Sequence, residues 1–344
     1  MHRPFLITGG CGFVGRNLTK KLLSRGEEIW IIDNLFTGKL PEKWLPKDYK
    51  KLQYKKRISL YKNKKSHLYF IQADLMELLS HEMNDGTAIL PNFSDVFHLA
   101  SIVGGRELIE NDPLLVAKDL AIDSYFFLWV SRFLKKHKRI LYPSSSAAYP
   151  VTLQNAKNKT VLKENHFDFS SYIGVPDMTY GWSKLTGEYL SKIAAEKYGV
   201  HVACVRPFSG YGEDQELVYP IPAIARRFAR REDPLSVWGT GKQGRDFVHI
   251  DDCIEAFFIA LDNISDGSAV NIGSGKLTTF LEVIEIFSKV SGFKPQIKKN
   301  INKPVGVHSR YGNAEKLKRM GWKQTINNKE GFKRVLEFMQ LHKI

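Results

Sequence analysis

Tyr180 and Lys184 stand four positions apart in the segment YGWSK, and both are suited to proton transfer. In a helix this spacing puts the two side chains on one face, one turn apart, so the ammonium group can stabilise an ionised phenol. An ionised phenol is a base that can take the proton of an alcohol while a hydride leaves the same carbon. The same spacing occurs at Tyr61 and Lys65, so the pair needs further support.

A run of serines distinguishes Tyr180 from Tyr61. The serines at 144–146 follow a short apolar segment that reads as a strand, and a hydroxyl there can hold a substrate oxygen in line with the tyrosine. Tyr61 lies in a lysine-rich segment without such a partner. Tyr180 with Lys184 is therefore our candidate catalytic pair.

A glycine-rich segment, TGGCGFVG, follows the first predicted strand and leads into a helix. Small residues at Gly9, Gly12 and Gly15 let the backbone approach a pyrophosphate, whose charge is met by free N–H groups at the helix start. Asp33 ends the second predicted strand, where a carboxylate can accept adenosine ribose hydroxyls and repels a 2′-phosphate. This predicts NAD rather than NADP. Asp74, after the third strand, is either an adenine ligand or the N-cap of the next helix.

The pKa of the phenol has to fall from about 10 toward neutrality, and a shift of ~3 units needs ~4 kcal/mol. A unit charge at ~5 Å and an effective dielectric of ~20 supplies about 3 kcal/mol before desolvation is subtracted. Lys184 alone is marginal, whereas Lys184 together with an oxidised nicotinamide ring is sufficient. We therefore expect Tyr180 to be a strong base only beside the oxidised cofactor.

Short apolar runs alternate with amphipathic stretches in the first half of the chain, which is typical of a parallel sheet with helices on both faces. From about Arg206 the pattern changes to Pro/Gly-rich stretches mixed with helices. We predict an α/β protein with a Rossmann-type doubly wound parallel sheet in residues 1–205. Residues 206–344 are predicted to form mainly a smaller C-terminal α/β substrate-binding domain, with some segments returning to the first. The predicted strands are Phe5–Thr8, Glu28–Asp33, Leu68–Gln72, Asp95–Ala100, Arg139–Pro143 and Val200–Val205, and the predicted helices are Gly12–Ser24, Pro113–Lys136 and Thr179–Tyr198.

The composition, 43% hydrophobic and 25% charged over 344 residues, is that of a globular protein. No run of eighteen apolar residues exists, and the apolar patch near the first residue is too short for a signal peptide. The cysteines Cys11, Cys204 and Cys253 lie far apart without metal-ligand spacing, so we expect neither a disulfide framework nor a metal site. These features together predict a cytoplasmic location.

The net charge of +15 is concentrated in a basic insertion at about residues 39–67. Between Lys39 and Ser66 stand eleven basic and two acidic residues, which supply nine of the fifteen charges. Such a segment is either a solvated insertion or a docking surface for an anionic partner such as RNA or a membrane. Because no nucleic-acid-binding motif accompanies it, we favour the solvated insertion and expect neither nucleic acid nor membrane as a partner.

Taken together, the motifs resemble those of extended short-chain dehydrogenases/reductases, in the group of NAD-dependent nucleotide-sugar epimerases and dehydratases. The resemblance covers nearly the whole chain and implies a nucleotide-diphosphate sugar as substrate. It also implies a homodimer formed through the helix that bears Tyr180 and the helix before it. The motifs are TGGCGFVG (8–15), DNLFTGK (33–39), AD (73–74), HLA (98–100), SSSAAYP (144–150), YGWSK (180–184), RPFSGYG (206–212), GRDFVHIDD (244–252) and NIGSG (271–275).

The resemblance also implies roles for individual residues. The catalytic hydroxyl falls on Ser145, which joins Tyr180 and Lys184, and arginines at 245 and 310 are suited to clamp a diphosphate unless they form surface ion pairs. The implied substrate ligands are Gly104, Gly105, Ser145, Ser146, Ser209, Arg245 and Arg310. The expected NAD ligands are Gly9, Gly12, Phe13, Val14, Gly15, Asp33, Asn34, Asp74, Leu75, Leu99, Ala100, Ser101, Tyr180, Lys184 and Pro207.

Members of the group differ in the residues that follow the catalytic hydroxyl. The 4,6-dehydratases have an Asp-Glu pair where this chain has Ser146 and Ala147, so water elimination lacks its acid and base. The GDP-mannose 3,5-epimerase branch has a cysteine in place of Ala147 and a lysine in the loop that here reads EDQELVYPIP, although Gly104-Gly105 is similar to that branch. Hydride transfer alone remains. The resemblance therefore implies oxidation at C4 of the sugar and re-reduction from the opposite face, which is a 4-epimerase.

Several other reactions stay open. A nucleotide-sugar 4-dehydrogenase or 4-ketoreductase needs the same three catalytic residues, and a GDP-mannose 3,5-epimerase-like reaction is also possible. A hypothesis of another class is a catalytically silent NAD-binding scaffold that docks through the basic insertion. Ser209 and Asp119 stand at or near positions where relatives commonly have asparagine, so we expect the sugar contacts to differ from theirs.

Overall fold

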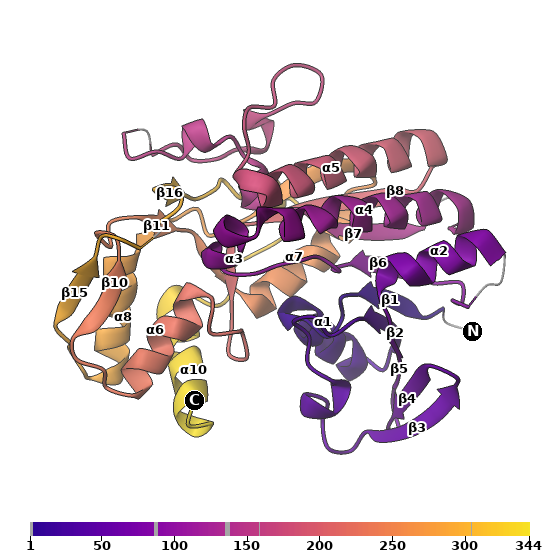
Figure 1. Ribbon diagram of the computed structural model, residues 1–344, viewed down its shortest axis with the longest axis horizontal. Helices are drawn as coiled ribbons and strands as arrows, with labels where there is room; N and C mark the ends of the chain where they lie inside the picture. Colours follow the sequence, from indigo (N-terminus) through magenta and orange to yellow (C-terminus); the bar gives the residue numbers. More distant parts are fainter. Residues whose placement is uncertain (1–2, 86–88, 135–137, 158, 304) are drawn as a thin grey trace.

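One large twisted sheet organises the computed structural model, which describes residues 3–85, 89–134, 138–157, 159–303 and 305–344 (Figure 1). Within these ranges nine strands pair in the order β13-β8-β7-β6-β1-β2-β5-β4-β3, and those from β13 to β5 run parallel. The predicted α/β fold with a doubly wound parallel sheet is confirmed. The parallel strands are β1 (Phe5–Thr8), β2 (Glu28–Asp33), β5 (His67–Gln72), β6 (Asp95–His98), β7 (Arg139–Pro143), β8 (His201–Pro207) and β13 (Asp266–Ile272).

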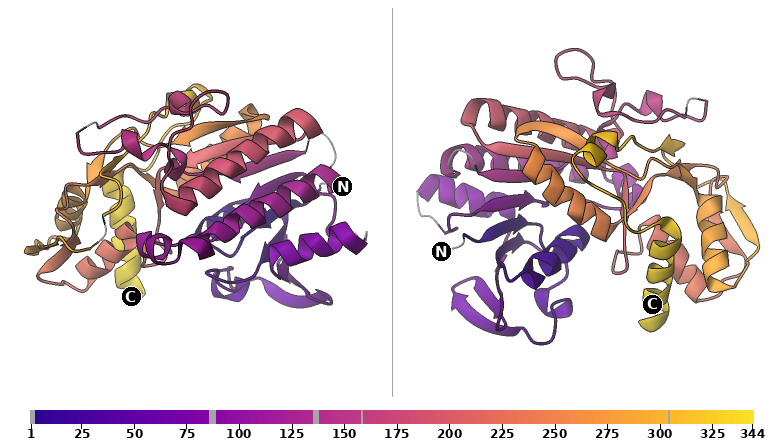
Figure 2. Two further views of the ribbon diagram at one scale, coloured as in Figure 1. Left: turned by 45° about the horizontal axis from the view of Figure 1, so that its top comes forward. Right: turned by 180° about the vertical axis from the view of Figure 1, so that it is seen from behind.

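Helices cover both faces of this sheet, so the parallel strands are nearly continuous apolar runs (Figure 2). On one face lie α2 (Leu75–Asp85), α4 (Pro113–Phe133) and α5 (Met178–Tyr198). On the other lie α1 (Phe13–Ser24) and α7 (Ile250–Asn263). The helix predicted to reach Lys136 ends at Phe133, and Lys136 lies outside the described residues.

The order of the strands defines where ligands bind. The chain adds β2 and β5 on one side of β1 and then crosses to place β6, β7, β8 and β13 on the other side. The connections that leave β1 and β6 therefore diverge, and a crevice opens outside the carboxyl ends of these two strands. The glycine-rich turn after β1 and the segment after β6 border it.

The basic insertion contains a β-hairpin that we did not predict from the sequence, and every residue of its outer strand is exposed. After a short helix, η1 (Pro41–Lys43), it forms a hairpin of β3 (Lys50–Lys55) and β4 (Ile58–Lys62), and β4 pairs antiparallel with β5. Tyr61 lies on the strand β4 and is only 2% exposed. Because it is on a strand, Tyr61 does not share a helix face with Lys65. The exposed edge strand β3 carries lysines, which discourage edge-to-edge pairing with another chain.

The C-terminal part packs around its own aromatic cluster, in which Phe287 stacks on Phe228 and Phe332. No described helix is both long and apolar enough to span a bilayer. The domain boundary at 205/206 stays a prediction. The helices and strand of this part that contribute to the cluster include α6 (Pro220–Ala229), β10 (Leu235–Trp238), α8 (Phe280–Ser291) and α10 (Asn328–Leu341). The exposed strand β15 (Ile297–Asn300) pairs with β10. The shorter elements are α3 (Arg106–Asn111), η2 (Ser146–Ala148), η3 (Val151–Leu153), η4 (Glu164–His166), β9 (Ser209–Tyr211), β11 (Gly244–Arg245), β12 (Phe247–His249), β14 (Thr278–Thr279), β16 (Ser309–Arg310) and α9 (Glu315–Arg319).

Candidate active site

The glycine-rich turn forms an open cradle at the start of α1. Gly9 has a positive φ of 68°, and a Cβ atom there would lie 2.7 Å from the backbone nitrogen of Ala100. A Cβ atom on Gly15 would lie 2.5 Å from the Gly9 carbonyl oxygen. The absence of side chains at these two glycines therefore allows the glycine-rich turn to pack closely against α1 and against the segment at Ala100. A Cβ atom on Gly12 would meet only the Gly9 carbonyl, at 3.4 Å. Gly12 is the uncapped N-cap of α1, and its open side can receive a pyrophosphate.

Asp33 ties the end of β2 to this turn. Its two carboxylate oxygens accept the backbone N–H groups of Cys11, at 2.9 Å, and Leu35, at 2.7 Å. Burial raises the pKa of Asp33, although these backbone hydrogen bonds lower it in part. The carboxylate keeps further lone pairs for ribose hydroxyls. Asn34 is exposed beside it, and its side chain accepts from Phe36 N at 3.0 Å.

Asp74 caps α2. Its Oδ1 accepts the backbone N–H of Met76 at 3.0 Å, and Lys118 Nζ lies 3.4 Å from its Oδ2. Of the two roles considered for Asp74, these contacts favour the cap. The side chain of Leu75, the first residue of α2, is buried and packs in the core.

The segment after β6 carries Leu99, Ala100 and Ser101, all half-buried at the crevice. Asp119, on α4, braces it by accepting hydrogen bonds from Ser101 Oγ, at 2.6 Å, and Ile102 N, at 2.5 Å. Burial raises the pKa of Asp119 to about 6. Asp119 thus stands where we expected altered contacts, and its partners belong to the segment that borders the cofactor crevice.

Tyr180 and Lys184 share one face of α5, as the spacing predicts. Lys184 Nζ lies 5.7 Å from the centroid of the Tyr180 ring, and the lysine is 4% exposed whereas the tyrosine is half-buried. Burial lowers the pKa of the Lys184 amine, but the fields of Tyr180 and of two buried aspartates raise it, and the net shift is upward. The ammonium therefore stays charged beneath the phenol.

Ser145 lies just after the end of strand β7 and faces the same region. It caps η2, where its Oγ accepts from Ala147 N at 3.1 Å. The Ala147 carbonyl accepts the Asp177 N–H at 2.9 Å, and a Cβ atom on Gly181 would lie 2.5 Å from that carbonyl oxygen. These contacts bring the Ser145 turn against the start of α5, next to Tyr180.

Not every predicted ligand faces the crevice. Ser146 is 1% exposed and its hydroxyl donates to the Phe208 carbonyl at 3.4 Å, so the structure directs it into the core. Pro207 ends β8 and Ser209 begins β9, both half-buried. At Gly104 and Gly105 the chain is tightly packed, because a Cβ atom on Gly105 would lie 2.7 Å from the Val218 carbonyl oxygen.

Two arginines bind Asp177, three residues before Tyr180, and a third arginine lies beside them. Arg106 donates through Nη1 to Asp177 at 2.9 Å, and Arg310 through Nη2 at 2.7 Å. Arg245, on β11, pairs in register with Arg310, on β16. Arg106 was not predicted from the sequence, where only its position after Gly104-Gly105 sets it apart from surface arginines.

The charges of this arginine cluster, Arg106, Arg245 and Arg310, are incompletely compensated. Burial and the neighbouring Arg310 lower the pKa of Arg245 to about 9. Among the described residues no carboxylate pairs with Arg245, whose guanidinium donates to the carbonyls of Gly244 and Val305. Burial raises the pKa of Asp177 but the arginines lower it, with a net downward shift, so it remains an anion. A cluster with this excess of positive charge can bind an anion with planar, bidentate geometry.

The sequence matches a known protein family over most of its length. The model of the NAD dependent epimerase/dehydratase family matches residues 5–273. This chain belongs to that family. NAD is the cofactor of the family, and the open side of Gly12, the start of α1 and the Asp33 carboxylate fit it.

Individual relatives cover nearly the whole chain. A Methanocaldococcus jannaschii protein, provisionally named UDP-glucose 4-epimerase, is 28% identical over 97% of this chain and 98% of its own length. UDP-glucuronic acid decarboxylase 1 of Arabidopsis thaliana is 26% identical over 96% of this chain and 68% of its own length. The fold matches UDP-glucuronic acid 4-epimerase from Bacillus cereus, solved with UDP-glucuronic acid and NAD, with a TM-score of 0.78 at 21% identity. That alignment covers 98% of this chain and 99% of the other.

Replacing Arg106 by glutamine is expected to weaken the binding of nucleoside diphosphates about ten-fold or more, because a charge-assisted hydrogen-bonding group is removed from the cluster. Titration calorimetry with UDP, GDP, CDP and dTDP measures this effect without any turnover. The exposed Arg132→Gln, at the end of α4, is the control and should bind like the wild type. Unchanged affinity for all four nucleotides in the Arg106 variant would contradict an anion site at this cluster.

Asp119→Asn is expected to change how stability depends on pH. The folded-state pKa of Asp119 is raised from 3.8 to about 6, so its ionisation disfavours the folded state as the pH rises through this window. The unfolding free energy of the variant, relative to that of the wild type, should therefore rise by on the order of 2 kcal/mol between pH 4 and pH 7. Urea unfolding at both pH values measures this gain. The control is Asp112→Asn, at the exposed N-cap of the same helix, whose unfolding free energy should differ from that of the wild type by the same amount at pH 4 and pH 7. If the difference between Asp119→Asn and the wild type is also the same at both pH values, the raised pKa of Asp119 is refuted.

Proposed function

We propose that this protein is an NAD-dependent epimerase that inverts C4 of a nucleotide-diphosphate sugar. The observation that carries the proposal is the placement of Tyr180, over the buried Lys184 ammonium, beside the Ser145 turn at the edge of the cofactor crevice. Ala147 and the inward-facing Ser146 offer no carboxylate for water elimination. The provisional 4-epimerase name of a full-length relative supports the same reaction.

The residues act on the C4 hydroxyl as follows. The Tyr180 phenolate takes its proton, and the Lys184 ammonium stabilises that phenolate. Ser145 holds the C4 oxygen by a hydrogen bond during both half-reactions. NAD, when bound, supplies the hydride acceptor and returns the hydride. For inversion, the keto sugar rotates in the site while Tyr180 keeps the proton. After the rotation the hydride returns to the opposite face of C4, and Tyr180 donates the proton back to the C4 oxygen.

The arginine cluster holds the diphosphate during this rotation. Arg245 and Arg310 lie on paired strands of the C-terminal part, and Arg310 is tied through Asp177 to the start of α5. A diphosphate fixed on these guanidinium groups leaves the sugar free to rotate about its phosphate bonds. The same cluster would serve a nucleotide-sugar 4-dehydrogenase or 4-ketoreductase, so product analysis has to separate these reactions.

A 3,5-epimerase and a silent NAD-binding scaffold have less support in the site. A 3,5-epimerase has no acid or base at Ala147, and the segment from Glu213 to Tyr219 contains no lysine. A silent scaffold that docks through the basic insertion would not need a charged lysine buried under a crevice tyrosine. The hairpin also pairs with the sheet, which gives the insertion a structural use.

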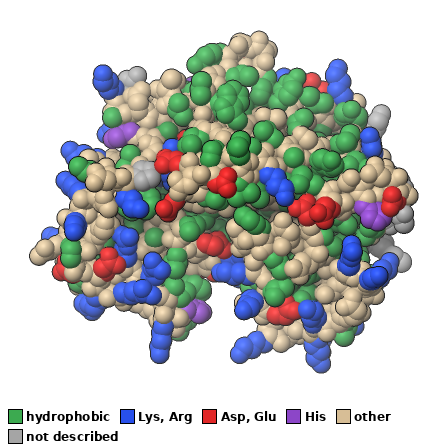
Figure 3. Space-filling model, in the orientation of Figure 1, with side chains coloured by type: hydrophobic (Ala, Val, Ile, Leu, Met, Phe, Trp, Pro, Cys, Tyr) green, Lys and Arg blue, Asp and Glu red, His purple; other side chains and the backbone are tan. Residues whose placement is uncertain are grey.

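A homodimer is also part of the proposal. Tyr125 and Leu128 on α4, and Trp182 and Tyr189 on α5, are large side chains exposed by 39%, 45%, 45% and 48%. Figure 3 shows hydrophobic side chains gathered over the face that these two packed helices form. An apolar face of this kind marks an interaction site, and two copies can bury it against each other.

Tyr180→Phe is expected to lower epimerisation about 10²- to 10⁴-fold, since the base is removed while the ring is kept. The assay incubates NAD-loaded protein with a panel of nucleotide hexoses and follows product stereochemistry together with absorbance of reduced nicotinamide. A C4 epimer without accumulated NADH supports the epimerase. Stoichiometric NADH indicates a dehydrogenase, and loss of one water from the sugar would refute the exclusion of a dehydratase. Tyr189→Phe, on the exposed side of the same helix, is the control and should retain activity.

The dimer is tested by introducing charge on the proposed face. The double variant Leu128→Glu/Trp182→Glu should sediment as a monomer at concentrations where the wild type is a dimer, because the carboxylates would be desolvated on association. Leu341→Glu, 78% exposed on α10, is the matched control and should leave the sedimentation unchanged. A monomeric wild type would contradict the proposed dimer.

A further inference from the structure

The segment 212–219, which we name the strap, connects β9 to α6 and has no regular secondary structure. In Figure 1 it is the salmon loop that descends between α1 and α6. Its sequence, GEDQELVY, carries three carboxylates, and two of these, Asp214 and Glu216, pair with the first turns of α1. Its contacts reach elements of the large sheet layer that are distant from it in sequence.

One end of the strap is fastened to α1 by Arg16. The Arg16 side chain is 0% exposed, and its Nε lies 3.1 Å from Asp214 Oδ2. Its Nη2 donates to the Asp214 carbonyl at 3.1 Å and to Glu216 Oε1 at 3.2 Å. Its Nη1 donates to the Cys11 carbonyl at 2.8 Å, inside the glycine-rich turn. One guanidinium thus joins the strap to the turn that receives the pyrophosphate.

Further contacts centre on Asp214. Asn17 Nδ2 donates to Asp214 Oδ1 at 3.2 Å, and Lys20 Nζ lies 3.8 Å from Oδ2. Lys39, which follows the Asp33 loop, donates to the Asp214 carbonyl at 3.4 Å. Burial raises the pKa of Asp214, but Arg16 and Lys20 lower it, with a net downward shift, so the carboxylate keeps its charge.

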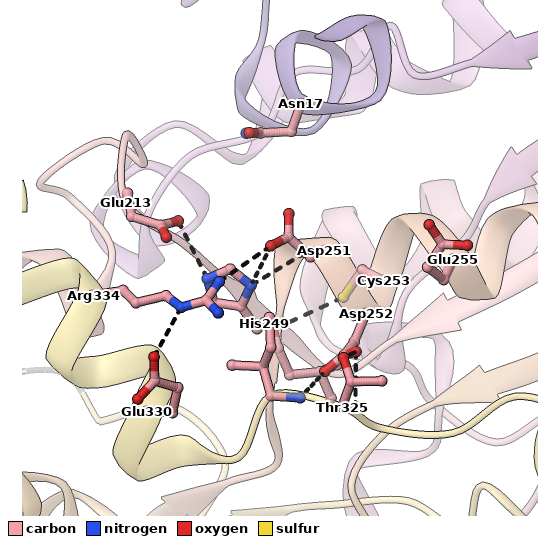
Figure 4. Close-up of polar contacts among 12 residues, drawn as sticks. Asn17, Glu213, His249, Asp251, Asp252, Cys253, Glu255, Thr325, Glu330 and Arg334 are labelled. Carbon is pink, nitrogen blue, oxygen red and sulfur yellow. Dashed lines mark hydrogen bonds and ion pairs between the residues drawn. The ribbon is translucent and has the colours of Figure 1, made fainter. Parts of the chain in front are cut away.

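The strap also has contacts beyond α1. Glu213 points toward His249, as Figure 4 shows, with its Oε2 3.2 Å from His249 Nε2. Farther along, the Val218 carbonyl lies against Gly105, in the segment that follows β6. The strap therefore runs from the start of α1, which follows β1, to the segment after β6. β1 and β6 are the neighbouring strands between which the cofactor crevice opens, so the strap crosses it.

We infer that Arg16 is a positioning residue that retains NAD by holding the strap closed over the crevice. The inference rests on the proposed function in one respect: an epimerase regenerates its oxidised cofactor in every turnover and has no need to release it. A dehydrogenase has to exchange the cofactor each time, and a closed strap would limit its rate. The Arg16–Asp214 contact thus favours the non-exchanging reaction of the two that share the same catalytic residues.

The test measures release of NAD in the absence of sugar. Wild-type protein loaded with radiolabelled NAD is mixed with excess unlabelled NAD, and the bound label is followed by rapid gel filtration. Asp214→Ala should release NAD at least ten-fold faster than the wild type. Asp214→Asn keeps the size of the side chain and should also release faster, which provides a second variant if the alanine variant unfolds. Arg16→Lys retains the charge without the fork of donors and should be intermediate.

A matched control separates the strap from general stability. Glu255 on α7 pairs with Lys21 of α1 at 2.6 Å, outside the strap, so Glu255→Gln should release NAD like the wild type. Urea unfolding of the cofactor-free proteins shows whether each variant is folded. Equal release rates for the folded Asp214 variants and the wild type would overturn the inference, as would a wild type that exchanges NAD within one turnover time. Failure of the proposed reaction would instead show as absent epimer with saturating NAD, so the two outcomes are distinguishable.

Discussion

The buried ammonium group of Lys184 imposes the central constraint on this structure. It lies 5.7 Å from the Tyr180 ring and 5.5 Å from the Tyr142 ring, both measured to the centroid, and it needs negative charge from the protein interior. Asp119 and Asp123 supply that charge from α4, so α4 and α5 have to pack closely. Gly187, on α5, allows this, because a Cβ atom there would lie 2.7 Å from Asp123 Oδ2 on α4.

Asp123, one of these two aspartates, also links the surroundings of Lys184 to the glycine-rich turn. Tyr142 donates to Asp123 Oδ2 at 2.6 Å, and His98 Nε2 lies 3.1 Å from Oδ1. Thr8 bonds to His98 Nδ1 at 2.8 Å and ends β1, one residue before the glycine-rich turn. Burial lowers the pKa of His98, so the imidazole is neutral and the chain of hydrogen bonds is consistent with a proton on Nε2. Tyr142, Asp123, His98 and Thr8 thus form a buried network between Lys184 and the glycine-rich turn.

Sequence reasoning located the elements well where burial dominates. The six predicted strands all exist with small differences at their ends, because strands covered on both faces are continuous apolar runs. Sequence reasoning did not predict the hairpin of β3 and β4, because the many lysines of the edge strand β3 conceal the alternation of apolar and polar residues that marks a strand. Sequence reasoning also missed Arg106 and the strap. Arg106 and its partner Asp177 are 71 residues apart in the chain, and Arg16 and its partner Asp214 are 198 residues apart. No local pattern predicts the distant partners of these arginines.

The family, the fold class, the glycine-rich turn and the placement of Tyr180 and Lys184 on one helix could all be predicted from the order of residues along the chain. Each of these depends on residues close together in the chain, so spacing and periodicity carry the information. The folded arrangement was needed to establish that the Ser146 hydroxyl donates to the Phe208 carbonyl, that Arg106 and Arg310 bind Asp177 and that Arg16 pairs with Asp214. These contacts depend on charges from distant segments meeting in a buried space, where the low dielectric makes compensation necessary. Which segments meet is set by the order of the strands, and a local sequence pattern does not contain that order.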